Sequence, residues 1–384
     1  MKIIFTGGGT GGHFYPLIAV AEAVNELVAE QRLLQPNLVY MSPTPFDEEA
    51  LFHANITYTR TPAGKIRRYF AISNVIDFFR TIYGAIWSFF KLLSDVPDVV
   101  FSKGGYASVP TVLAAHWLGV PIVIHESDSK PGRANLMASK YAYRIAVTFE
   151  SSIQYFPEKV RGKIALTGIP IRRALATPLP EGAAQELRLD MSVPTVLVIG
   201  GSLGSKRINE TLMQALPQVL ESANIIHQTG KNNFEETIST AKVIVENSAH
   251  KERYHAFPYL SLESMRMAAG AASLVVSRAG STAITEIALW KKPAILIPIP
   301  ESVSHDQRTN AYSYAHTGAA VVLEEENMTP NLLASEIRRI TADPALMQSM
   351  AEHGKGFANP NAARLVAEEL LRIALTHAPK TPTA

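Results

Sequence analysis

The chain has 384 residues, of which 47% are hydrophobic and 18% charged, and a formal net charge of +2. This length predicts two globular domains, each large enough to bury its own core. So small a net charge gives no global signature of nucleic-acid binding, and no nucleic-acid partner is expected. The absence of cysteine excludes disulfides, thiolate metal sites and cysteine nucleophiles. The first residues lack the apolar core of a signal peptide, which predicts a cytoplasmic protein.

A glycine-rich stretch begins the chain. A buried strand, 1–5, runs through Thr6 into Gly-Gly-Gly-Thr-Gly-Gly-His13, and apolar residues at helical spacing follow. Glycines between a strand and a helix let a phosphate or sugar approach the unpaired N–H groups of the helix start. The stretch fits G-x-G-x-x-G, but the next predicted strand, 38–41, ends in Ser-Pro-Thr and offers no acid for the ribose of a dinucleotide. A nucleotide-binding oxidoreductase is therefore disfavoured.

The first half continues with alternating strands and helices. A strand at 98–102 ends in a second glycine turn, Lys103-Gly104-Gly105-Tyr106. A strand at 121–125 ends in the polar cluster His125 to Gly132, and ligands of open α/β sheets bind at such carboxyl ends. The other elements expected here are helices at 46–53, 109–118 and 133–143 and strands at 56–59, 144–148 and 164–167.

A broad apolar stripe recurs at helical spacing between residues 72 and 93. Asp77, Arg80 and Lys91 interrupt it, so the helix is too polar to span a bilayer. Two interpretations stay open: the stripe packs on the protein core, or its aromatic face lies on an anionic bilayer. In the second interpretation the face is flanked by basic residues; they are Lys65, Arg67, Arg68, Arg80 and Lys91.

A passage rich in Pro and Ala, 173–191, predicts a domain boundary. After it, the second half repeats the alternation of strands, glycine-rich turns and helices. A strand at 194–199 leads into Gly-Gly-Ser-Leu-Gly-Ser, and a strand at 272–276 leads into a small-residue turn with a helix start near Ser281. The alternation predicts two doubly wound, Rossmann-like parallel sheets facing a cleft. Further strands are expected at 225–228, 254–257, 293–298 and 319–323, helices at 264–271, from 330 and at 361–375, and a disordered tail from Thr376.

Six motifs resemble, in order and spacing, the MurG family of bacterial peptidoglycan glycosyltransferases. They are Gly8-Gly9-Thr10-Gly11-Gly12-His13, Gly104-Gly105-Tyr106, His125-Glu126-Ser127-Asp128, Gly168-Ile169-Pro170-Ile171-Arg172, Gly200-Gly201-Ser202, and Arg278-Ala279-Gly280-Ser281-Thr282 through Glu286. The run His305-Asp306-Gln307 with Asn310 adds to the match, which covers nearly the whole chain.

The resemblance implies a GT-B fold and a reaction. The family moves N-acetylglucosamine from UDP-GlcNAc to the C4 hydroxyl of the muramoyl sugar of lipid I, with inversion, and forms lipid II at the cytoplasmic face of the bacterial inner membrane. It uses no cofactor and no metal bound by Asp-x-Asp, a motif this sequence lacks. We expect an acceptor-binding and membrane-associating domain at 1–172, a UDP-GlcNAc-binding domain at 173–355, and a terminal helix and tail at 356–384 that packs back on the first domain.

The resemblance also implies the substrate contacts. For the donor they are Arg172 and Ser202 near the diphosphate, Leu262 at the uracil, Ser281, Thr282 and Ala283 at the start of a phosphate-facing helix with Ile284 and Thr285 after them, Glu286 on the ribose and Gln307 on the GlcNAc hydroxyls. Thr10, Gly11, Gly12 and Asp128 of the first half complete the donor contacts. The turns with Gly8, Gly9, Gly104, Gly105 and Tyr106 face the acceptor diphosphate.

Two positions depart from the family pattern. Leu203 stands where the family usually has Gln, and Ile169 stands where it has Asn. Each change removes a polar group near the donor, but neither removes a group that the transfer requires.

His13 is the candidate general base that deprotonates the acceptor hydroxyl. The positive end of a helix disfavours imidazolium there, which suits a base. Because Glu126 and Asp128 are expected on another loop of the cleft, an orienting role for His13 stays open. Arg278 is either a site residue or a helix-start ion pair, and His125 is interpreted as structural.

Two rival functions share this build. One is a GT-B enzyme that transfers a UDP-sugar to a soluble acceptor, and the other is a UDP-GlcNAc 2-epimerase. The membrane-facing stretch separates them from the leading hypothesis, because only a lipid-linked acceptor requires it.

Overall fold

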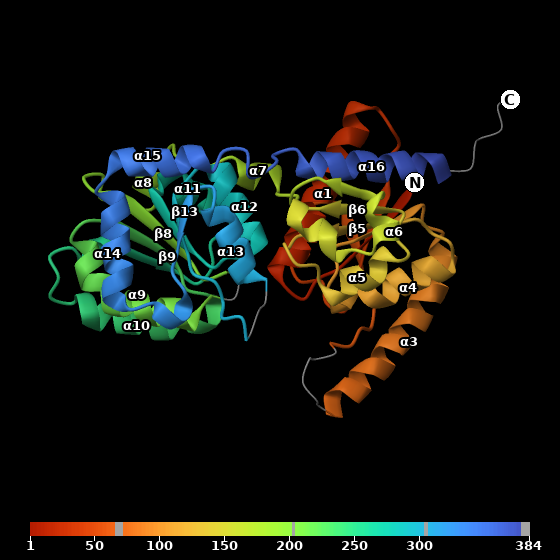
Figure 1. Cartoon of the computed structure of the whole chain (residues 1–384), viewed down its shortest axis with the longest axis horizontal. Helices are drawn as coiled ribbons and strands as arrows, with labels where there is room; N and C mark the ends of the chain where they lie inside the picture. Colours follow the sequence, from red (N-terminus) through yellow and green to blue (C-terminus); the bar gives the residue numbers. More distant parts are fainter. Residues whose placement is uncertain (66–71, 202–203, 303–305, 378–384) are drawn as a thin grey trace. The chain divides into compact units, whose positions relative to one another are not determined.

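The computed structural model describes residues 1–65, 72–201, 204–302 and 306–377. The chain divides into two compact units, Met1–Arg172 with Asn359–Ala384 (unit 1) and Arg173–Ala358 (unit 2) (Figure 1). Each unit contains one sheet, and neighbouring strands in both sheets run parallel. The predicted α/β class with two doubly wound sheets is confirmed.

Unit 1 has a seven-stranded sheet of order β3-β2-β1-β4-β5-β6-β7. Its strands are β1 (Lys2–Thr6), β2 (Asn37–Ser42), β3 (Ile56–Arg60), β4 (Val99–Ser102), β5 (Ile122–Glu126), β6 (Arg144–Val147) and β7 (Ile164–Leu166). Its helices are α1 (Gly11–Glu30), α2 (Glu48–His53), α3 (Ile72–Asp95), α4 (Val109–Trp117), α5 (Arg133–Ser139), α6 (Glu158–Arg161) and α16 (Ala362–His377), with 3-10 turns η1 (Tyr106–Ser108) and η2 (Glu150–Tyr155).

Unit 2 has a six-stranded sheet of order β10-β9-β8-β11-β12-β13. Its strands are β8 (Thr195–Ile199), β9 (Asn224–Gln228), β10 (Tyr254–Phe257), β11 (Leu274–Ser277), β12 (Ala294–Leu296) and β13 (Ala320–Val322). Its helices are α7 (Arg173–Ala176), α8 (Ala183–Glu186), α9 (Lys206–Leu220), α10 (Phe234–Val245), α11 (Leu262–Ala271), α12 (Ser281–Trp290), α13 (Gln307–Ala315), α14 (Pro330–Thr341) and α15 (Pro344–His353), with 3-10 turns η3 (Lys231–Asn233), η4 (Lys251–Arg253) and η5 (Glu325–Asn327).

The strand order reverses at the same place in both sheets. In unit 1 the reversal falls between β1 and β4, where Thr6 is paired with Ser102. In unit 2 it falls between β8 and β11, where Ile199 is paired with Ser277. The segments after these strands leave each sheet side by side, at the point where open parallel sheets bind ligands. All four segments are the glycine-rich or small-residue turns singled out from the sequence.

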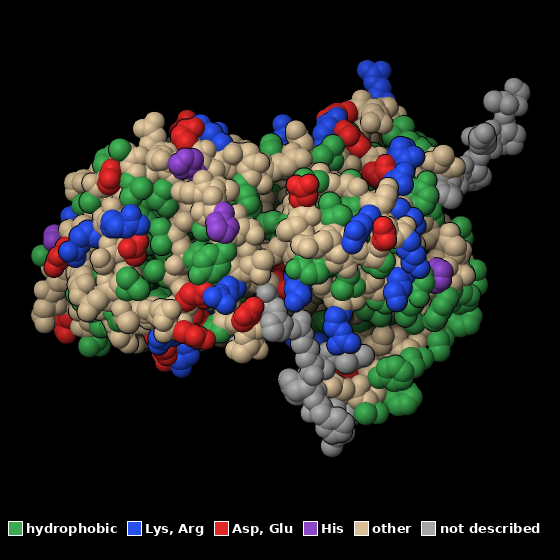
Figure 2. Space-filling model, viewed as in Figure 1, with side chains coloured by type: hydrophobic (Ala, Val, Ile, Leu, Met, Phe, Trp, Pro, Cys, Tyr) green, Lys and Arg blue, Asp and Glu red, His purple; other side chains and the backbone are tan. Residues whose placement is uncertain are grey.

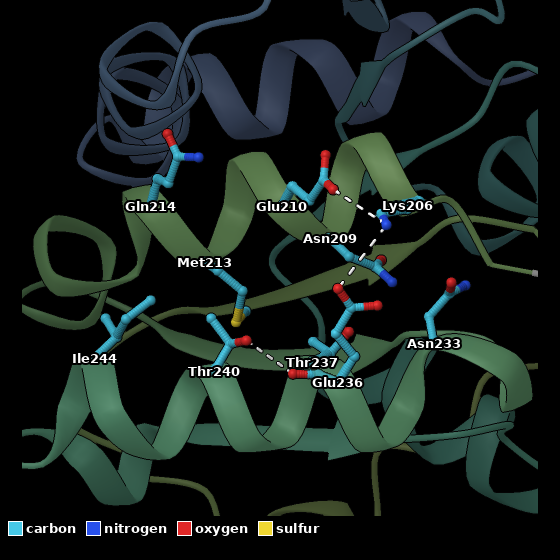
Figure 3. A pocket seen from close by; sticks show the side chains of 10 residues that line it. All are labelled: Lys206, Asn209, Glu210, Met213, Gln214, Asn233, Glu236, Thr237, Thr240 and Ile244. Carbon is cyan, nitrogen blue, oxygen red and sulfur yellow. Dashed lines mark hydrogen bonds and ion pairs between the residues drawn. The ribbon is translucent and has the colours of Figure 1, made fainter.

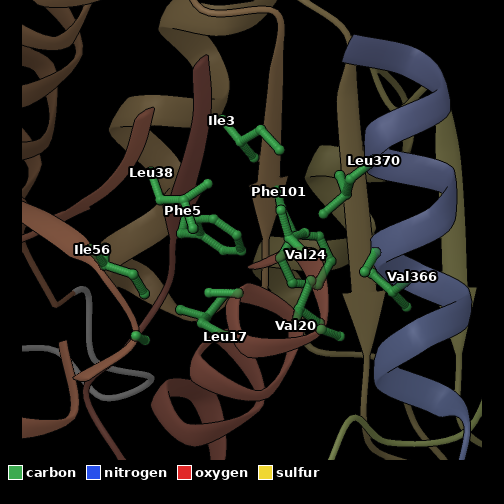
Figure 4. Packing of buried hydrophobic residues seen from close by; sticks show 14 of the residues in the cluster. Ile3, Phe5, Leu17, Val20, Val24, Leu38, Ile56, Phe101, Val366 and Leu370 are labelled. Carbon is green, nitrogen blue, oxygen red and sulfur yellow. The ribbon is translucent and has the colours of Figure 1, made fainter. Parts of the chain in front are cut away.

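The last helix of the chain completes the core of unit 1. Val366 and Leu370 of α16 are buried in one cluster with Phe101 and residues of α1, and Figure 4 shows both side chains directed at that cluster. An ion pair between Arg364 and Glu30, at 2.8 Å, also joins α16 to α1. Of the tail predicted from Thr376, Thr376 and His377 belong to α16, and the rest lies outside the described residues.

Two helices are shorter than predicted. The helix expected from Phe46 begins at Glu48, because Phe46 has a φ of +65° and Asp47 caps the helix by accepting a hydrogen bond from the Ala50 N–H. The helix expected to reach Tyr143 ends at Ser139, because the Tyr143 N–H donates to the Ile122 carbonyl at 2.7 Å and returns the chain to the sheet.

The passage at 173–191 is folded against unit 2. It contains α7 and α8, and the Trp290 indole N–H of α12 donates to the Leu175 carbonyl at 2.8 Å. The Leu179 N–H donates to the Arg266 carbonyl at 2.9 Å. Its Pro and Ala content therefore reflects a close-packed surface segment of this unit.

Helix α3 buries only one side. Ala85, Ser88 and Leu92 are buried, whereas most of the predicted apolar stripe is exposed. The core-packing interpretation is wrong for the exposed residues, which are Val75, Ile76, Phe79, Ile82, Tyr83, Ile86, Phe90 and Leu93. Figure 2 shows hydrophobic side chains gathered over α3. No helix in the described ranges is long and apolar enough to cross a membrane. Arg67 and Arg68 lie outside those ranges.

Candidate active site

The first glycine turn of unit 1 is pressed against its neighbours. The Tyr40 hydroxyl donates to the Gly7 carbonyl at 2.8 Å. Gly8 has a φ of +126°, and a Cβ there would lie 2.6 Å from that hydroxyl. A side chain at Gly8 would force either the turn or the Tyr40 side chain to shift, and the positive φ also favours glycine there.

The second glycine turn touches the first. Gly105 has a φ of +77°, and a Cβ there would lie 3.0 Å from the Gly8 carbonyl oxygen and 3.7 Å from the His13 ring. A Cβ at Gly9 would lie 3.0 Å from the Tyr106 ring. The residues predicted to face the acceptor, with His13, are thus neighbours in unit 1.

His13 lies in the first turn of α1, partly buried. Its Nδ1 is 2.9 Å from the Thr10 hydroxyl oxygen. Burial, followed by the Lys103 ammonium, lowers the pKa of His13 to about 4, and Asp128 opposes this. The ring is therefore neutral at pH 7. In the tautomer whose Nδ1–H donates to the Thr10 oxygen, Nε2 carries the lone pair that a general base needs.

A buried polar cluster lies behind His13. Lys103 is 1% exposed and its ammonium donates to the Ser127 hydroxyl. The buried Glu126 carboxylate accepts hydrogen bonds from the backbone N–H groups of Asp128, at 2.9 Å, and Gly132, at 3.0 Å. It also accepts one from the Asn135 amide at 2.9 Å. Glu126 therefore shapes the loop at 127–132, which carries Asp128.

Two predicted residues of unit 1 have internal contacts. The His125 ring nitrogen Nε2 is 2.8 Å from the Gly168 carbonyl, and burial lowers the pKa of His125 well below its usual value, which agrees with a structural role. The Arg172 guanidinium stacks over the Tyr15 ring, 4.5 Å from its centre. Within the described part of the chain, its buried Nε has no hydrogen-bond partner.

Helix α12 presents an uncapped N-terminus at the switch point of unit 2. Its N-cap is Gly280, which has no side chain to bond the first N–H groups. Such an end attracts anions. Thr282, Ala283 and Glu286 are partly buried, while the side chains of three other predicted residues are buried within unit 2; these are Ser281, Ile284 and Thr285.

The Arg278 side chain bonds other residues of unit 2. Its guanidinium donates to the Ser205 hydroxyl at 2.6 Å and to the Ile297 carbonyl at 3.2 Å, and it forms an ion pair with Glu325. Ser205 is itself the N-cap of α9. The structure thus contains the ion pair that one alternative for Arg278 predicts.

Gln228 bridges two walls of the predicted donor site, and sequence reasoning missed it. It is buried, its amide nitrogen donates to the Gly201 carbonyl at 3.2 Å, and its amide oxygen accepts from the Leu260 N–H at 2.9 Å. Leu262, predicted at the uracil, begins α11 two residues later. The only available signal was a polar residue at the end of a buried strand.

Gln307 begins α13, and its amide oxygen accepts from the Ile299 N–H at 3.2 Å. The amide is thereby oriented with its other end available as a donor. Ser202, Leu203 and His305 lie outside the described residues. Across the described ranges, no three His, Cys, Asp or Glu side chains gather as metal ligands would.

A pocket of about 140 Å³ lies between α9 and α10 (Figure 3). Its charges are mutually paired, since the Lys206 ammonium is 3.8 Å from Glu210 and 3.9 Å from Glu236. None of the residues predicted to contact the donor lines it. We assign it no role in the reaction.

Known proteins resemble the whole chain. A curated Clostridium kluyveri protein named UDP-N-acetylglucosamine–N-acetylmuramyl-(pentapeptide) pyrophosphoryl-undecaprenol N-acetylglucosamine transferase is 38% identical over 341 residues, 88% of this chain and 91% of the relative. A protein of that name from Treponema denticola is 32% identical over 96% of both chains. Models of the glycosyltransferase family 28 N-terminal and C-terminal domains match residues 3–147 and 195–366. The chain belongs to glycosyltransferase family 28.

Solved structures agree with the family 28 assignment. MurG of Acinetobacter baumannii has a TM-score of 0.71 and 27% identity, over 97% of this chain and 99% of that chain. The UDP-GlcNAc 2-epimerase of Neisseria meningitidis has a TM-score of 0.68 but 12% identity, over 97% of this chain and all of that one, so it shares the fold alone. The predicted GT-B fold is confirmed.

Proposed function

We propose that the protein is an inverting transferase that moves N-acetylglucosamine from UDP-GlcNAc to the C4 hydroxyl of the muramoyl sugar of lipid I. The product is lipid II. The observation that carries this proposal is the 38% identity to a relative named for such a transfer, over 88% of the chain. No cofactor takes part.

Unit 1 binds the acceptor in this proposal. The turns around Gly8 and Gly105 lie against each other with His13 beside them, and glycine backbone at a helix start suits a diphosphate. As O4 attacks the anomeric carbon, His13 Nε2 takes the O4 proton and the bond to UDP breaks on the opposite face, which inverts the centre. Support comes from the lowered pKa of His13, which keeps its ring neutral and able to accept a proton.

Unit 2 binds the donor. The N-terminus of α12 stabilises the UDP diphosphate, and Glu286 accepts hydrogen bonds from the ribose diol. Gln307 donates its oriented amide to a GlcNAc hydroxyl, in line with its bond to the Ile299 N–H. The remaining contacts follow the resemblance. In unit 2 they are Ser202, Leu262, Ser281, Thr282, Ala283, Ile284 and Thr285, and in unit 1 they are Thr10, Gly11, Gly12, Asp128 and Arg172.

The exposed face of α3 binds the cytoplasmic surface of the inner membrane in this proposal, because the acceptor is anchored there. Phe79 is 63% and Phe90 64% exposed, which is unusual for aromatic side chains on a soluble surface. Arg80 on the same helix adds positive charge. Two further arginines, Arg67 and Arg68, precede the helix in the sequence. An amphipathic helix of this kind suits anionic lipid.

Flotation with liposomes tests the membrane contact. The double variant Phe79→Ser, Phe90→Ser should lose most of its binding to anionic vesicles, whereas Val243→Ser, at an exposed apolar site of unit 2, should bind as wild type does. Binding that is equal in all three proteins, or absent in wild type, would contradict the proposal.

The transfer is tested by incubating the protein with UDP-GlcNAc and a lipid I analogue. We expect UDP release matched by disaccharide formation, and no change of UDP-GlcNAc without acceptor. Conversion of UDP-GlcNAc alone would favour the epimerase. Equal turnover with a lipid-free muramoyl acceptor would favour a soluble-acceptor enzyme.

A further inference from the structure

Lys103 is a buried cation that the proposed chemistry does not use. It is 1% exposed, although lysine is almost never fully buried without a partner. Its backbone N–H donates to the Thr6 carbonyl at 2.9 Å, which fixes it at the sheet edge beside the first glycine turn. Burying an ammonium costs free energy that its surroundings must offset. A specific arrangement of partners is therefore required.

Three segments of the site meet at this side chain. A Cβ added at Gly7 would lie 3.0 Å from the Lys103 Cβ, so the lysine stem lies against the first glycine turn. Gly104 and Gly105, the next residues, form the turn that touches His13. The ammonium reaches the loop at 127–132 and donates to the Ser127 hydroxyl.

We propose that Lys103 is a positioning residue for the transfer: its buried ammonium fixes the loop that carries Asp128 against the glycine turns, and sets the charge environment in which His13 accepts a proton. The inference deepens the proposed function and, for its catalytic part, rests on it.

The charges around His13 support this role. Among the described residues, those that act on His13 are Lys103, from the turn after β4, and Asp128, from the loop after β5. Lys103 disfavours the imidazolium and Asp128 favours it. Burial lowers the pKa of Lys103 to about 8, while Glu126 and Asp128 oppose the shift, so the ammonium stays charged at pH 7. Burial is the largest cause of the lowered His13 pKa, and this pair of charges adjusts it further.

The direct test is an NMR titration of His13 in the full chain without substrates, with its signal assigned through His13→Gln. In Lys103→Met the His13 midpoint should rise by about one pH unit or more, since a cation close by has been removed. Lys103→Arg, which keeps the charge, should leave it near the wild-type value. The matched control is Lys130→Met, which removes an exposed lysine from the loop at 127–132. It should leave the His13 midpoint near the wild-type value.

Kinetics separate positioning from a merely structural role. With a lipid I analogue, Lys103→Met should lose more of its kcat/KM at pH 5.5 than at pH 8. A higher His13 pKa shifts the acidic side of the kcat/KM profile to higher pH. A loss that is uniform across pH, or an unchanged His13 midpoint in a folded variant with wild-type UDP affinity, overturns the proposal.

Folding and the function itself are controlled separately. If Lys103→Met does not fold, Lys103→Gln keeps a donor for Ser127 without the charge and should show the same rise in the His13 midpoint. If wild type transfers nothing, the proposed function fails while the titration still decides the effect of Lys103 on His13.

Discussion

The carboxyl edges of the two sheets share one topology but differ in chemistry. At the carboxyl edge of unit 1 a titratable histidine, His13, lies under the influence of the buried Lys103 ammonium and of Asp128. At the carboxyl edge of unit 2 two described polar side chains are bonded within the unit: Gln228 bonds two backbone groups, and Arg278 is paired with Glu325. The first arrangement suits proton transfer, and the second suits rigid recognition of a ligand.

The difference teaches that a doubly wound sheet fixes where ligands bind but not what happens to them. In unit 1 a buried cation changes the proton affinity of its neighbour. In unit 2 the cation at the equivalent turn, Arg278, is paired with Glu325, and the uncapped N-terminus of α12 is a source of positive potential. If this division holds, variants in unit 1 should lower turnover, and variants in unit 2 should weaken donor binding.

The largest expected effect is that of His13→Ala. Removing the base should lower turnover by a factor of about 10² to 10⁴, while the affinity for UDP, measured by calorimetry, stays as in wild type. The control is His53→Ala, which removes an exposed histidine of the same unit.

Near-wild-type turnover in purified His13→Ala would show that His13 is not the general base. His13→Gln refines the result, because glutamine can orient the acceptor but cannot accept a proton. Activity restored by glutamine would assign His13 an orienting role, with the base to be sought at Asp128 or Glu126.

The local sequence was sufficient for the scaffold and for the turns. Runs such as 196–199 are wholly buried and apolar, and the glycines after them can adopt positive φ, so both strand and turn are encoded by adjacent residues. The return of α16 to unit 1 depends instead on contacts between the two ends of the chain. The periodicity of residues 362–377 predicts a helix but not the surface on which it packs. The expectation that this helix packs on the first domain came from the family resemblance.

The missed residues share a cause. Lys103 and Gln228 belong to types that are mostly exposed, and their burial results from packing of segments distant in sequence. Likewise, the apolar period of α3 is the same whether its stripe meets a core or a bilayer, so periodicity alone could not separate the two. Exposure of Phe79 and Phe90 decided against the core.

Glu286→Gln should have the next largest effect. The change keeps the shape but removes a charged acceptor for the ribose hydroxyls, so the Kd for UDP should rise about ten- to a hundredfold. Calorimetry with UDP measures this, and the control is Glu246→Gln at the exposed end of α10. An unchanged Kd would exclude Glu286 from the donor site and weaken the contrast between the units.

Gln228→Leu should have a smaller effect of the same kind. It leaves the Gly201 carbonyl and the Leu260 N–H without their bonds, which loosens both walls of the donor site, and UDP affinity should fall about tenfold. Gln218→Leu, at an exposed position of α9, is the matched control. A fall in kcat without a change in UDP affinity would mean that unit 2 also acts in the chemical step.

The smallest effect on activity is expected at His227, a buried histidine of unit 2. Burial lowers its pKa to about 3, and the ring bonds the Asn209 amide and the Tyr254 hydroxyl, both at 3.0 Å. The folded-state pKa is below the unfolded value of about 6.5, so the stabilisation is present above pH 6.5 and is lost as pH falls, by about 1.4 kcal/mol per unit.

His227→Gln removes this titration. The difference in the free energy of unfolding of unit 2 between pH 7 and pH 5 should shrink by about 2 kcal/mol, with little change in turnover at pH 7. Urea denaturation in a Trp87→Phe, Trp117→Phe background, where Trp290 reports on unit 2, measures it. A steep loss of turnover in His227→Gln without a change in acid stability would contradict the division between the units. His227 of unit 2 would then take part in the reaction, as His13 does in unit 1.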